Sequence, residues 1–318
     1  SPFSSPIVIA KKKNGGLRMC IDYRKLNSRT IKDSYALPRI EEYFHALANS
    51  TMFSSLDATK GYLGIPIAEE HKSRTAFTAG PLGHWECNSM WYGLTSAPAT
   101  YQRMMEKCCR DLNLLQCVIF LDDIMAFSVG FEQHLERLEA IFKRLKEYGI
   151  KLQPSKCNLF RERVSYLGHI VSKEGIETDP EKIAALKTWP APTNVKELRT
   201  FLGFAGYYHP FVRDFSKIAR PLHDLTAGQP NKKSKGQRKK GKQSTLPQWK
   251  WGVEEQKAFD QLIQKLTSPP ILRYADYTKP FILHVDACTD GIGTALYQEI
   301  DRKDRVIAYA SRGLNKSE

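Results

Sequence analysis

Short apolar runs bounded by turn-forming residues recur along the first 125 positions of the chain. Five of them are rich in β-branched or aromatic residues and are flanked by Gly, Asn or Pro, as β-strands are: "PIVIAKK", "LRMCIDY", "MFSSLDA", "RTAFTA" and "CVIFL". Two intervening segments, "PRIEEYFHALAN" and "SAPATYQRMMEKCCRDL", have helical character. The alternation predicts an α/β (α+β) fold in which a sheet packs on helices.

Helical periodicity becomes clearer further along the chain. Residues 132–148 carry apolar side chains at every third or fourth position, which predicts one amphipathic helix. An Asp-Pro pair at 179 provides a helix start, and Asn194 with Glu197 three residues later resembles a capping box. Residues 179–225 are therefore predicted to be an all-helical unit.

The segment 226–248 consists mainly of Gly, Lys, Gln and Ser and cannot build a core, so we expect a flexible basic linker. A new unit begins with the helical pattern "WKWGVEEQKAFDQLIQKL", followed by the strand-like runs "PFILHVDAC" and "GIGTALYQEI". About 70 residues follow the linker, fewer than the roughly 100 to 150 of a common domain. We expect this last unit to be incomplete.

The length of 318 residues allows two domains or three small ones. The longest apolar stretch, 114–121, is far shorter than the roughly 20 residues that cross a bilayer. Seven cysteines without a C-x-x-C pair argue against a disulfide framework or a zinc site. The first residues lack the order of a secretory signal, so we expect an intracellular fragment of a longer chain, in the cytoplasm or nucleus and not secreted.

The formal net charge is +14, and residues 231–243 hold seven Lys and Arg without an acid. A basic chain favours a polyanionic partner such as nucleic acid, because each neutralised phosphate releases counterions. The basic run by itself is equally typical of a solvated linker.

Two adjacent acids, Asp122 and Asp123, interrupt the apolar run "VIFLDDIMAF". Consecutive side chains of a strand point to opposite faces, so we expect the pair at the bend of a hairpin. Two charges about 4 Å apart repel by roughly 4 kcal/mol at an effective dielectric of 20, a cost that a divalent cation reverses. Such a pair alone usually marks a solvated turn. Asp57, at the end of the apolar strand in "FSSLDATKGY", supplies a third acid that we expect beside Asp122, and three aspartates can hold two Mg²⁺ ions about 3.5 to 4 Å apart.

Six blocks occur in a recognisable order and approximate spacing: "LRMCIDYRKLN", "SSLDATKGY", "YGLTSAPATYQ", "FLDDI", "KLQPSKC" and "YLGHIVS". Together they resemble reverse transcriptases, most closely those of gypsy-type LTR retrotransposon (Metaviridae) polyproteins, over nearly the whole chain. The resemblance implies a right-hand polymerase fold followed by the start of a ribonuclease H-like α/β unit. Its parts are fingers and palm in 1–171, a helical thumb in 172–225, the linker in 226–248 and the ribonuclease H-like unit in 249–318.

The resemblance also assigns the reacting centre. Asp57, Asp122 and Asp123 match the catalytic carboxylates that bind two Mg²⁺ ions, with Mn²⁺ as an alternative. Tyr62 matches the aromatic gate that excludes a ribose 2′-hydroxyl, a steric filter, although an ordinary core role stays open. Lys156 matches a proposed general acid to the pyrophosphate, and a plain solvated lysine is the alternative.

Nucleotide-binding positions follow in the same way. Lys12, Lys13 and Arg18 match fingers residues that grip the triphosphate, with an exposed hairpin as the alternative. Gly93 lies where a small residue lets backbone approach the nucleotide and the template base, and Gln102 lies on the following helix, where it could touch the template.

Two further groups of residues complete the comparison with the family. Leu167, Gly168 and His169 match the primer grip. Asp286 matches the first metal-binding aspartate of ribonuclease H-like domains, but the other acids of that site are expected beyond residue 318. We therefore expect hybrid cleavage from a parent polyprotein and not from this chain alone.

The resemblance implies an RNA-directed DNA polymerase that extends a primer on an RNA or DNA template with deoxynucleoside triphosphates and has no membrane partner. The oligomeric state is not indicated. Phe120 replaces the usual tyrosine before Leu-Asp-Asp, and Trp91 replaces a proline beside the nucleotide pocket. These departures keep an alternative open, namely a decayed or host-reused fragment that binds nucleic acid without catalysis.

Overall fold

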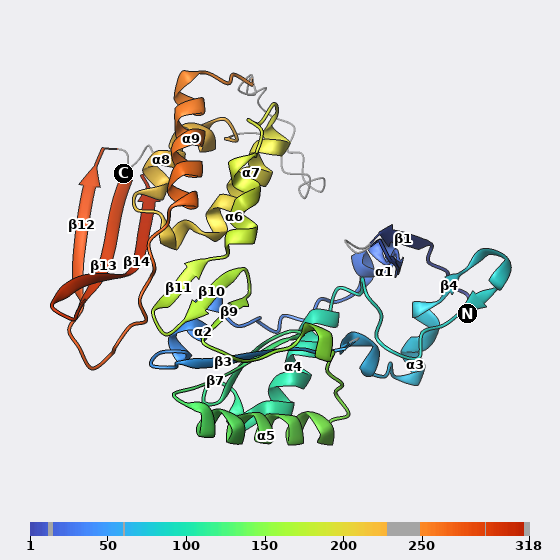
Figure 1. The fold of residues 1–318 in the computed structure, drawn as a ribbon. Coiled ribbons are helices and arrows are strands. Elements are labelled where there is room, and N and C mark those ends of the chain that lie inside the picture. Colours follow the sequence, from blue (N-terminus) through green and yellow to red (C-terminus); the bar gives the residue numbers. More distant parts are fainter. Residues whose placement is uncertain (12–14, 60, 228–248, 290, 315–318) are drawn as a thin grey trace. The chain divides into compact units, whose positions relative to one another are not determined.

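The computed structural model describes residues 1–11, 15–59, 61–227, 249–289 and 291–314 (Figure 1). The chain divides into two compact units, Ser1–Leu167 and Gly168–Glu318. The domain boundaries expected at 171 and 225 stay predictions. Almost all of the expected linker, and Lys12 and Lys13, lie outside the described residues. None of the helices in the described ranges combines the length and the apolar character needed to cross a bilayer.

A four-stranded antiparallel sheet forms the centre of the first unit. Its strands, in spatial order, are β6 (Cys117–Phe120), β7 (Asp123–Ser128), β3 (Met52–Asp57) and β8 (Asn158–Arg161). Helices α4 (Ala97–Cys109) and α5 (Phe131–Glu147) pack on one side of it (Figure 1). Strands β6 and β7 read as continuous apolar runs because nearly all their side chains are buried.

The amphipathic helix expected from periodicity is α5, so that prediction is confirmed within one residue at each end. Its buried side chains are His134, Leu138, Ile141 and Leu145. Apolar Leu135 and Phe142 remain exposed, because the apolar stripe of the sequence is wider than the face that the sheet covers.

Smaller elements complete the first unit. They are β1 (Ile7–Lys11), β2 (Leu17–Ile21), α1 (Arg24–Arg29), α2 (Ile40–Ala46), η1 (Gly61–Gly64), α3 (Glu69–Lys72), η2 (Ser73–Thr75), β4 (Phe77–Thr78), η3 (Gly80–Leu82), β5 (His84–Trp85), η4 (Arg110–Leu112), η5 (Pro154–Lys156) and β9 (Arg163–Tyr166). The run "RTAFTA" forms a strand over two residues only, since a 3₁₀ turn occupies its first half. Strands β1 and β2 pair in an antiparallel ladder.

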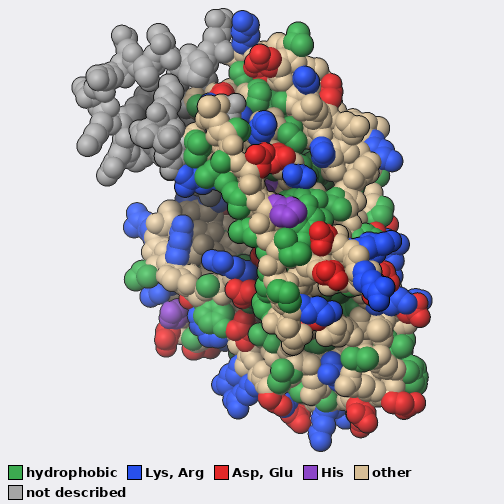
Figure 2. All heavy atoms as spheres, turned by 90° about the vertical axis from the view of Figure 1, so that its left-hand side faces the viewer, with side chains coloured by type: hydrophobic (Ala, Val, Ile, Leu, Met, Phe, Trp, Pro, Cys, Tyr) green, Lys and Arg blue, Asp and Glu red, His purple; other side chains and the backbone are tan. Residues whose placement is uncertain are grey.

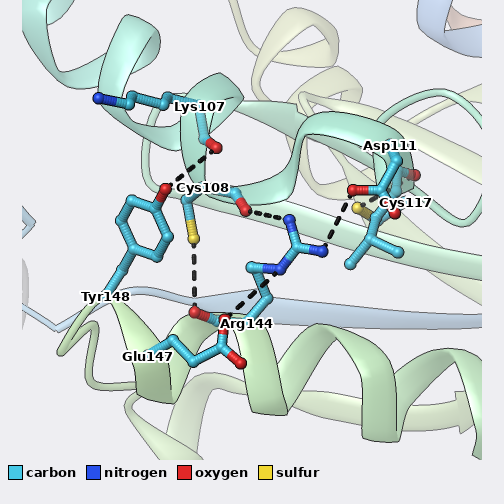
Figure 3. Close-up of polar contacts among 8 residues, drawn as sticks. Lys107, Cys108, Asp111, Cys117, Arg144, Glu147 and Tyr148 are labelled. Carbon is cyan, nitrogen blue, oxygen red and sulfur yellow. Dashed lines mark hydrogen bonds and ion pairs between the residues drawn. The ribbon is translucent and has the colours of Figure 1, made fainter.

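A polar latch ties the end of α4 to α5 (Figure 3). The Arg144 guanidinium donates to the carbonyl of Cys108 at 3.0 Å and to Asp111 Oδ1 at 3.1 Å. Its Nε lies 3.8 Å from Glu147 Oε2, and the Tyr148 hydroxyl donates to a further α4 carbonyl at 3.4 Å. The carbonyls at a helix end lack partners within the helix, so the latch satisfies two of them and fixes the end of α4.

The described residues of the second unit form two groups of paired strands and four α-helices. Its elements are β10 (His169–Ser172), β11 (Gly175–Thr178), α6 (Pro180–Lys187), α7 (Val195–Tyr207), η6 (His209–Phe211), α8 (Phe215–Asp224), α9 (Val253–Thr267), β12 (Ile282–Cys288), β13 (Gly291–Ile300) and β14 (Lys303–Gly313). The side chains of Asp179 and Asn194 accept from the backbone N–H groups of Glu181 and Glu197, so both predicted helix starts are confirmed. Strand β14 was not predicted; it pairs with β13 over nearly its full length.

Candidate active site

Asp57 and Asp123 lie opposite each other where β3 meets β7. They are register partners at the end of this antiparallel ladder. Asp122 lies in the β6–β7 turn, as expected, and its carbonyl accepts from Ala58 N at 3.2 Å. The expected neighbour of Asp57 was Asp122; the ladder makes Asp123 the direct partner, because β7 begins one residue after the turn.

The side chain of Gln102, on α4, hydrogen-bonds to the turn that carries Asp122. Leu121 adopts a positive φ of 54°, and its N–H donates to Gln102 Oε1 at 2.7 Å. The Nε2 of Gln102 donates to the carbonyl of Ile119 at 2.9 Å and to Glu106 Oε1 at 2.8 Å. Gln102 is completely buried, so its amide is occupied by protein partners in this structure.

Lys156 approaches the site from η5. Its ammonium nitrogen donates to both carboxylate oxygens of Asp57, at 3.1 and 3.2 Å. Both side chains reach solvent, with 55% of the lysine and 26% of the aspartate exposed. The lysine therefore balances the charge of Asp57 and remains accessible to a ligand.

Asp122 has a more closed environment. Its Oδ1 is buried and has no hydrogen-bond partner among the described residues. Burial, followed by repulsion from Asp123, raises the pKa of Asp122, and the nearby Tyr101 hydroxyl opposes that rise. Surrounding protein and the charge of Asp57 likewise raise the pKa of Asp123. The site thus concentrates negative charge that needs a counter-charge.

The three carboxylates fit a hard divalent cation by their chemistry, because Mg²⁺ prefers carboxylate oxygens. Within the part of the chain that the structure describes, no group of three or more His, Cys, Asp and Glu side chains is already arranged to hold a metal ion. The donor chemistry of the three carboxylates and their mutual repulsion are the observations that match a cation.

Aromatic rings line the side of the site next to Tyr62. The Tyr62 ring meets Tyr92 edge-on at 5.6 Å and Tyr101 edge-on at 5.2 Å. The Arg18 guanidinium lies over the Tyr92 ring, 5.5 Å from its centroid. Arg18 and Tyr62 are thereby linked through Tyr92, a residue that the sequence argument did not single out although it stands in the "YGLTSAPATYQ" block.

Gly93 has a positive φ of 100°, and a Cβ there would lie 3.0 Å from the carbonyl of Ile21. Its own carbonyl accepts from Asn27 Nδ2 at 2.8 Å, and the Asn27 Oδ1 accepts from Thr95 N at 2.9 Å. The glycine is therefore required first by the close packing of this loop on β2. This contact is within the protein, and the expected contact with nucleotide stays a prediction.

In the second unit, Gly168 directly precedes β10, and His169 is the first residue of that strand. The Gly168 carbonyl accepts from the Tyr208 hydroxyl at 2.9 Å. The His169 ring is buried and lies 5.5 Å from Phe211 in a stacked arrangement. Leu167, which closes the first unit, has a positive φ of 48°. The side chain of His169 is thus enclosed by aromatic rings, and the expected contact of this segment with the primer stays a prediction.

Asp286 is an exposed residue of β12 and the register partner of Gly293. A Cβ on Gly293 would lie 2.3 Å from Asp214 Oδ1, so Asp214, at the start of α8, approaches the sheet beside Asp286. The sequence argument did not single out Asp214, because it directly precedes α8 and lies far from β12 along the chain.

Charge does not single out one surface. On the face shown in Figure 2, Lys and Arg side chains are interspersed with Asp and Glu and do not gather into one patch. The net charge of +14 therefore supports a polyanionic partner without locating its interface on this face.

The fold and the acidic centre define a polymerase-type protein, and comparison with known families agrees. A family model described as reverse transcriptase (RNA-dependent DNA polymerase) matches residues 9–171, more than half of the chain. A second, described as RNase H-like domain found in reverse transcriptase, matches residues 251–318. The chain belongs to the reverse transcriptase family.

Its relatives are Pol polyproteins of gypsy-type and other LTR transposons. Over the whole chain it is 37% identical to the Retrovirus-related Pol polyprotein from transposon opus of Drosophila melanogaster and 35% identical to that from transposon gypsy, covering 32% and 30% of those proteins. The Transposon Tf2-3 polyprotein of Schizosaccharomyces pombe is 30% identical over 98% of the chain, which covers 22% of that protein. The chain thus spans about a third or less of these relatives.

Solved structures share the fold. The foamy viral protease-reverse transcriptase in complex with RNA/DNA hybrid matches 99% of the chain with a TM-score of 0.80 and 22% identity, and the chain covers 40% of it. The same protein in complex with dsDNA gives a TM-score of 0.83 at 22% identity, with 62% of that chain covered. The predicted right-hand polymerase fold with a ribonuclease H-like unit is confirmed.

Proposed function

We propose that the chain is an RNA-directed DNA polymerase, part of an LTR retrotransposon Pol polyprotein, that adds deoxynucleotides to a primer 3′ end on an RNA or DNA template. The observation that carries the proposal is the cross-strand pairing of Asp57 with Asp123, with Asp122 in the adjoining turn. A trio of carboxylates at one sheet end is a centre suited to two-metal nucleotidyl transfer.

Reverse transcriptases use divalent metal ions, and in this chain Asp57, Asp122 and Asp123 would hold two of them, Mg²⁺ by preference. Such ions activate the primer hydroxyl and stabilise the leaving pyrophosphate. Lys156 is proposed to give a proton to that pyrophosphate, and its contact with Asp57 at 3.1 Å supports a role within the site. Its exposure supports the role, because the leaving group must reach the ammonium from the solvent side.

Arg18 is proposed to grip the triphosphate, with Lys12 and Lys13 as partners that lie outside the described residues. The cation–π contact of its guanidinium with the Tyr92 ring supports the assignment, because that contact orients the guanidinium. Tyr62 is proposed to exclude the ribose 2′-hydroxyl, and the two edge-on rings that pack against it give the gate a fixed position.

Template and primer are proposed to bind through their phosphates, as the basic composition favours. The foamy viral relatives were solved with RNA/DNA hybrid and with dsDNA, which supports both template types here. We propose that the segment Leu167, Gly168 and His169 meets the primer, as its match to the primer grip of the family implies.

A second candidate function is nucleic-acid binding without catalysis. Trp91 stands in place of the usual proline, and its indole Nε1 is buried without a hydrogen-bond partner among the described residues. An unsatisfied buried donor is typical of a loop under strain or of one that awaits a ligand. Phe120 also lacks the hydroxyl of the usual tyrosine.

One experiment separates the two candidates. Primer extension with Mg²⁺ on an RNA template is measured for the wild type, Asp122→Asn and, as a matched control, Asp301→Asn, an exposed turn residue of the second unit. The polymerase proposal requires extension by the wild type and the control and its loss in Asp122→Asn. Unchanged extension in Asp122→Asn contradicts the site. Template binding without any extension supports the non-catalytic candidate.

A further inference from the structure

Tyr101, on α4, brings a phenol into the acidic site. Its side chain is 1% exposed. A Cβ built on Gly61 would lie 2.2 Å from Asp122 Oδ1 and 2.5 Å from the Tyr101 hydroxyl. The two oxygens therefore pack against the same glycine and are close neighbours, and a side chain at position 61 would displace both.

Both oxygens lack other partners. Neither the Tyr101 hydroxyl nor Asp122 Oδ1 makes a regular hydrogen bond with any described residue, although both are buried. A buried carboxylate oxygen without a donor is costly, and a phenol without an acceptor is also costly. The neighbouring pair can satisfy each other by a small rotation of either side chain.

We propose that Tyr101 is a positioning residue for Asp122: its hydroxyl donates to Oδ1 and so presents Oδ2 toward Asp57 and Asp123 as the cation ligand. The inference rests on the proposed polymerase function. It assigns to a tyrosine of α4 a role that the carboxylate pattern of the sequence does not reveal. The hydroxyl both stabilises the ionised carboxylate and fixes its rotamer before a cation arrives.

The ring of Tyr101 has a separate contact. It meets the Tyr62 ring edge-on at 5.2 Å. Tyr101→Phe removes the hydroxyl and keeps this ring contact, so cation binding weakens while discrimination against ribonucleotides stays as in the wild type. If Tyr101 only supported the fold, Tyr101→Phe would change both cation binding and ribonucleotide discrimination, or neither of them.

The test uses Mn²⁺ as the probe and binding as the readout. Free Mn²⁺ is titrated by electron paramagnetic resonance against the wild-type chain, Tyr101→Phe and Asp122→Asn. Tyr43→Phe is the matched control, because it removes another palm hydroxyl from a side chain that is also 1% exposed and that donates to the carbonyl of Ile119. Thermal melts verify that each variant is folded.

We expect Tyr101→Phe to weaken Mn²⁺ binding by roughly three- to ten-fold, as for loss of one buried hydrogen bond, with Tyr43→Phe within about two-fold of the wild type. Gly61→Ala should weaken binding as well, because its methyl group takes the space of Oδ1, and it serves if Tyr101→Phe does not fold.

The outcomes distinguish the two proposals. Loss of the site in Asp122→Asn with wild-type affinity in Tyr101→Phe overturns the role of Tyr101 and leaves the polymerase proposal intact. If the wild-type chain binds no Mn²⁺, or if Asp122→Asn binds Mn²⁺ as the wild type does, the polymerase proposal itself is overturned. Weaker binding in Tyr101→Phe, with unchanged ribonucleotide discrimination in primer extension, supports the inference.

Discussion

The ammonium of Lys156 and the carboxylate of Asp57 form a two-pronged contact, with Nζ 3.1 and 3.2 Å from the two oxygens. This pair joins η5 to the end of β3 and places the lysine beside the candidate metal ligands. We propose two roles for a lysine in that position: it balances charge before ligands bind, and it donates a proton afterwards.

Lys156→Ala is expected to slow single-nucleotide incorporation by about 10²-fold, the ordinary contribution of a general acid. Lys156→Arg keeps the positive charge, but a guanidinium is too weak an acid to give up a proton. We therefore expect this variant to bind nucleotide normally and to incorporate it slowly. Rapid-quench kinetics separates the rate from nucleotide affinity. Lys143→Ala, on the exposed side of α5, is the control. Full-speed incorporation by Lys156→Arg would argue for a purely electrostatic lysine.

His134 forms a buried link between β3 and β7. Its Nε2 lies 2.7 Å from Ser54 Oγ, and its Nδ1 lies 2.8 Å from Ser128 Oγ. The Ser128 hydroxyl donates to the carbonyl of Gly130, so its oxygen accepts from Nδ1–H, and Ser54 donates to Nε2. This arrangement favours the tautomer with its proton on Nδ1, and burial favours the neutral ring.

This link predicts a pH dependence of stability. Burial, with Arg137 nearby, lowers the pKa of His134 below its ordinary value of about 6.5. The unfolded chain thus takes up a proton at a higher pH than the folded chain does. The free energy of unfolding is highest above pH 6.5 and falls as the pH drops toward the folded pKa, by at most about 1.4 kcal/mol per pH unit from this group.

Urea unfolding at several pH values between 5 and 8 checks the prediction. His134→Gln should be less stable at neutral pH and should show a flatter pH dependence. His71→Gln, an exposed residue, is the control and should keep the wild-type slope. An unchanged slope in His134→Gln contradicts the assignment of this histidine.

Tyr62 is expected to set sugar selectivity. Tyr62→Val should raise ribonucleotide incorporation relative to deoxynucleotide incorporation by about ten- to one hundred-fold, because removal of a rigid ring opens space for a 2′-hydroxyl. Tyr62→Phe keeps the ring and its edge-on contacts with Tyr92 and Tyr101, so it should discriminate as the wild type does. Competition assays with both nucleotide types give the ratio. Equal selectivity in Tyr62→Val and the wild type would leave Tyr62 as an ordinary core residue.

The contacts of Arg144 between α4 and α5 predict that this side chain stabilises the first unit. Arg144→Ala removes the hydrogen bonds to the Cys108 carbonyl and to Asp111, and we expect the free energy of unfolding to fall by more than in the control variant. Lys143→Ala, one residue earlier on α5, should change it by less than about 0.5 kcal/mol. Urea unfolding measures both. A change in Arg144→Ala no larger than in Lys143→Ala would show that the latch adds nothing.

Local interactions made part of the fold predictable. The α5 periodicity and the caps at Asp179 and Asn194 depend on side chains within a few residues of one another, so the sequence alone located these helices. The hairpin turn at Asp122 followed from the pattern of apolar residues on both sides of it. The six sequence blocks predicted the family, because an ordered set of motifs is more specific than composition.

The remaining features were decided by tertiary structure. Cross-strand register made Asp123 the partner of Asp57, and packing of α4 under the sheet brought the Tyr101 hydroxyl to Asp122. Aromatic packing enclosed the ring of His169. Each of these contacts joins residues far apart in the chain, and its geometry depends on how whole elements pack, which side-chain patterns within a single element do not encode.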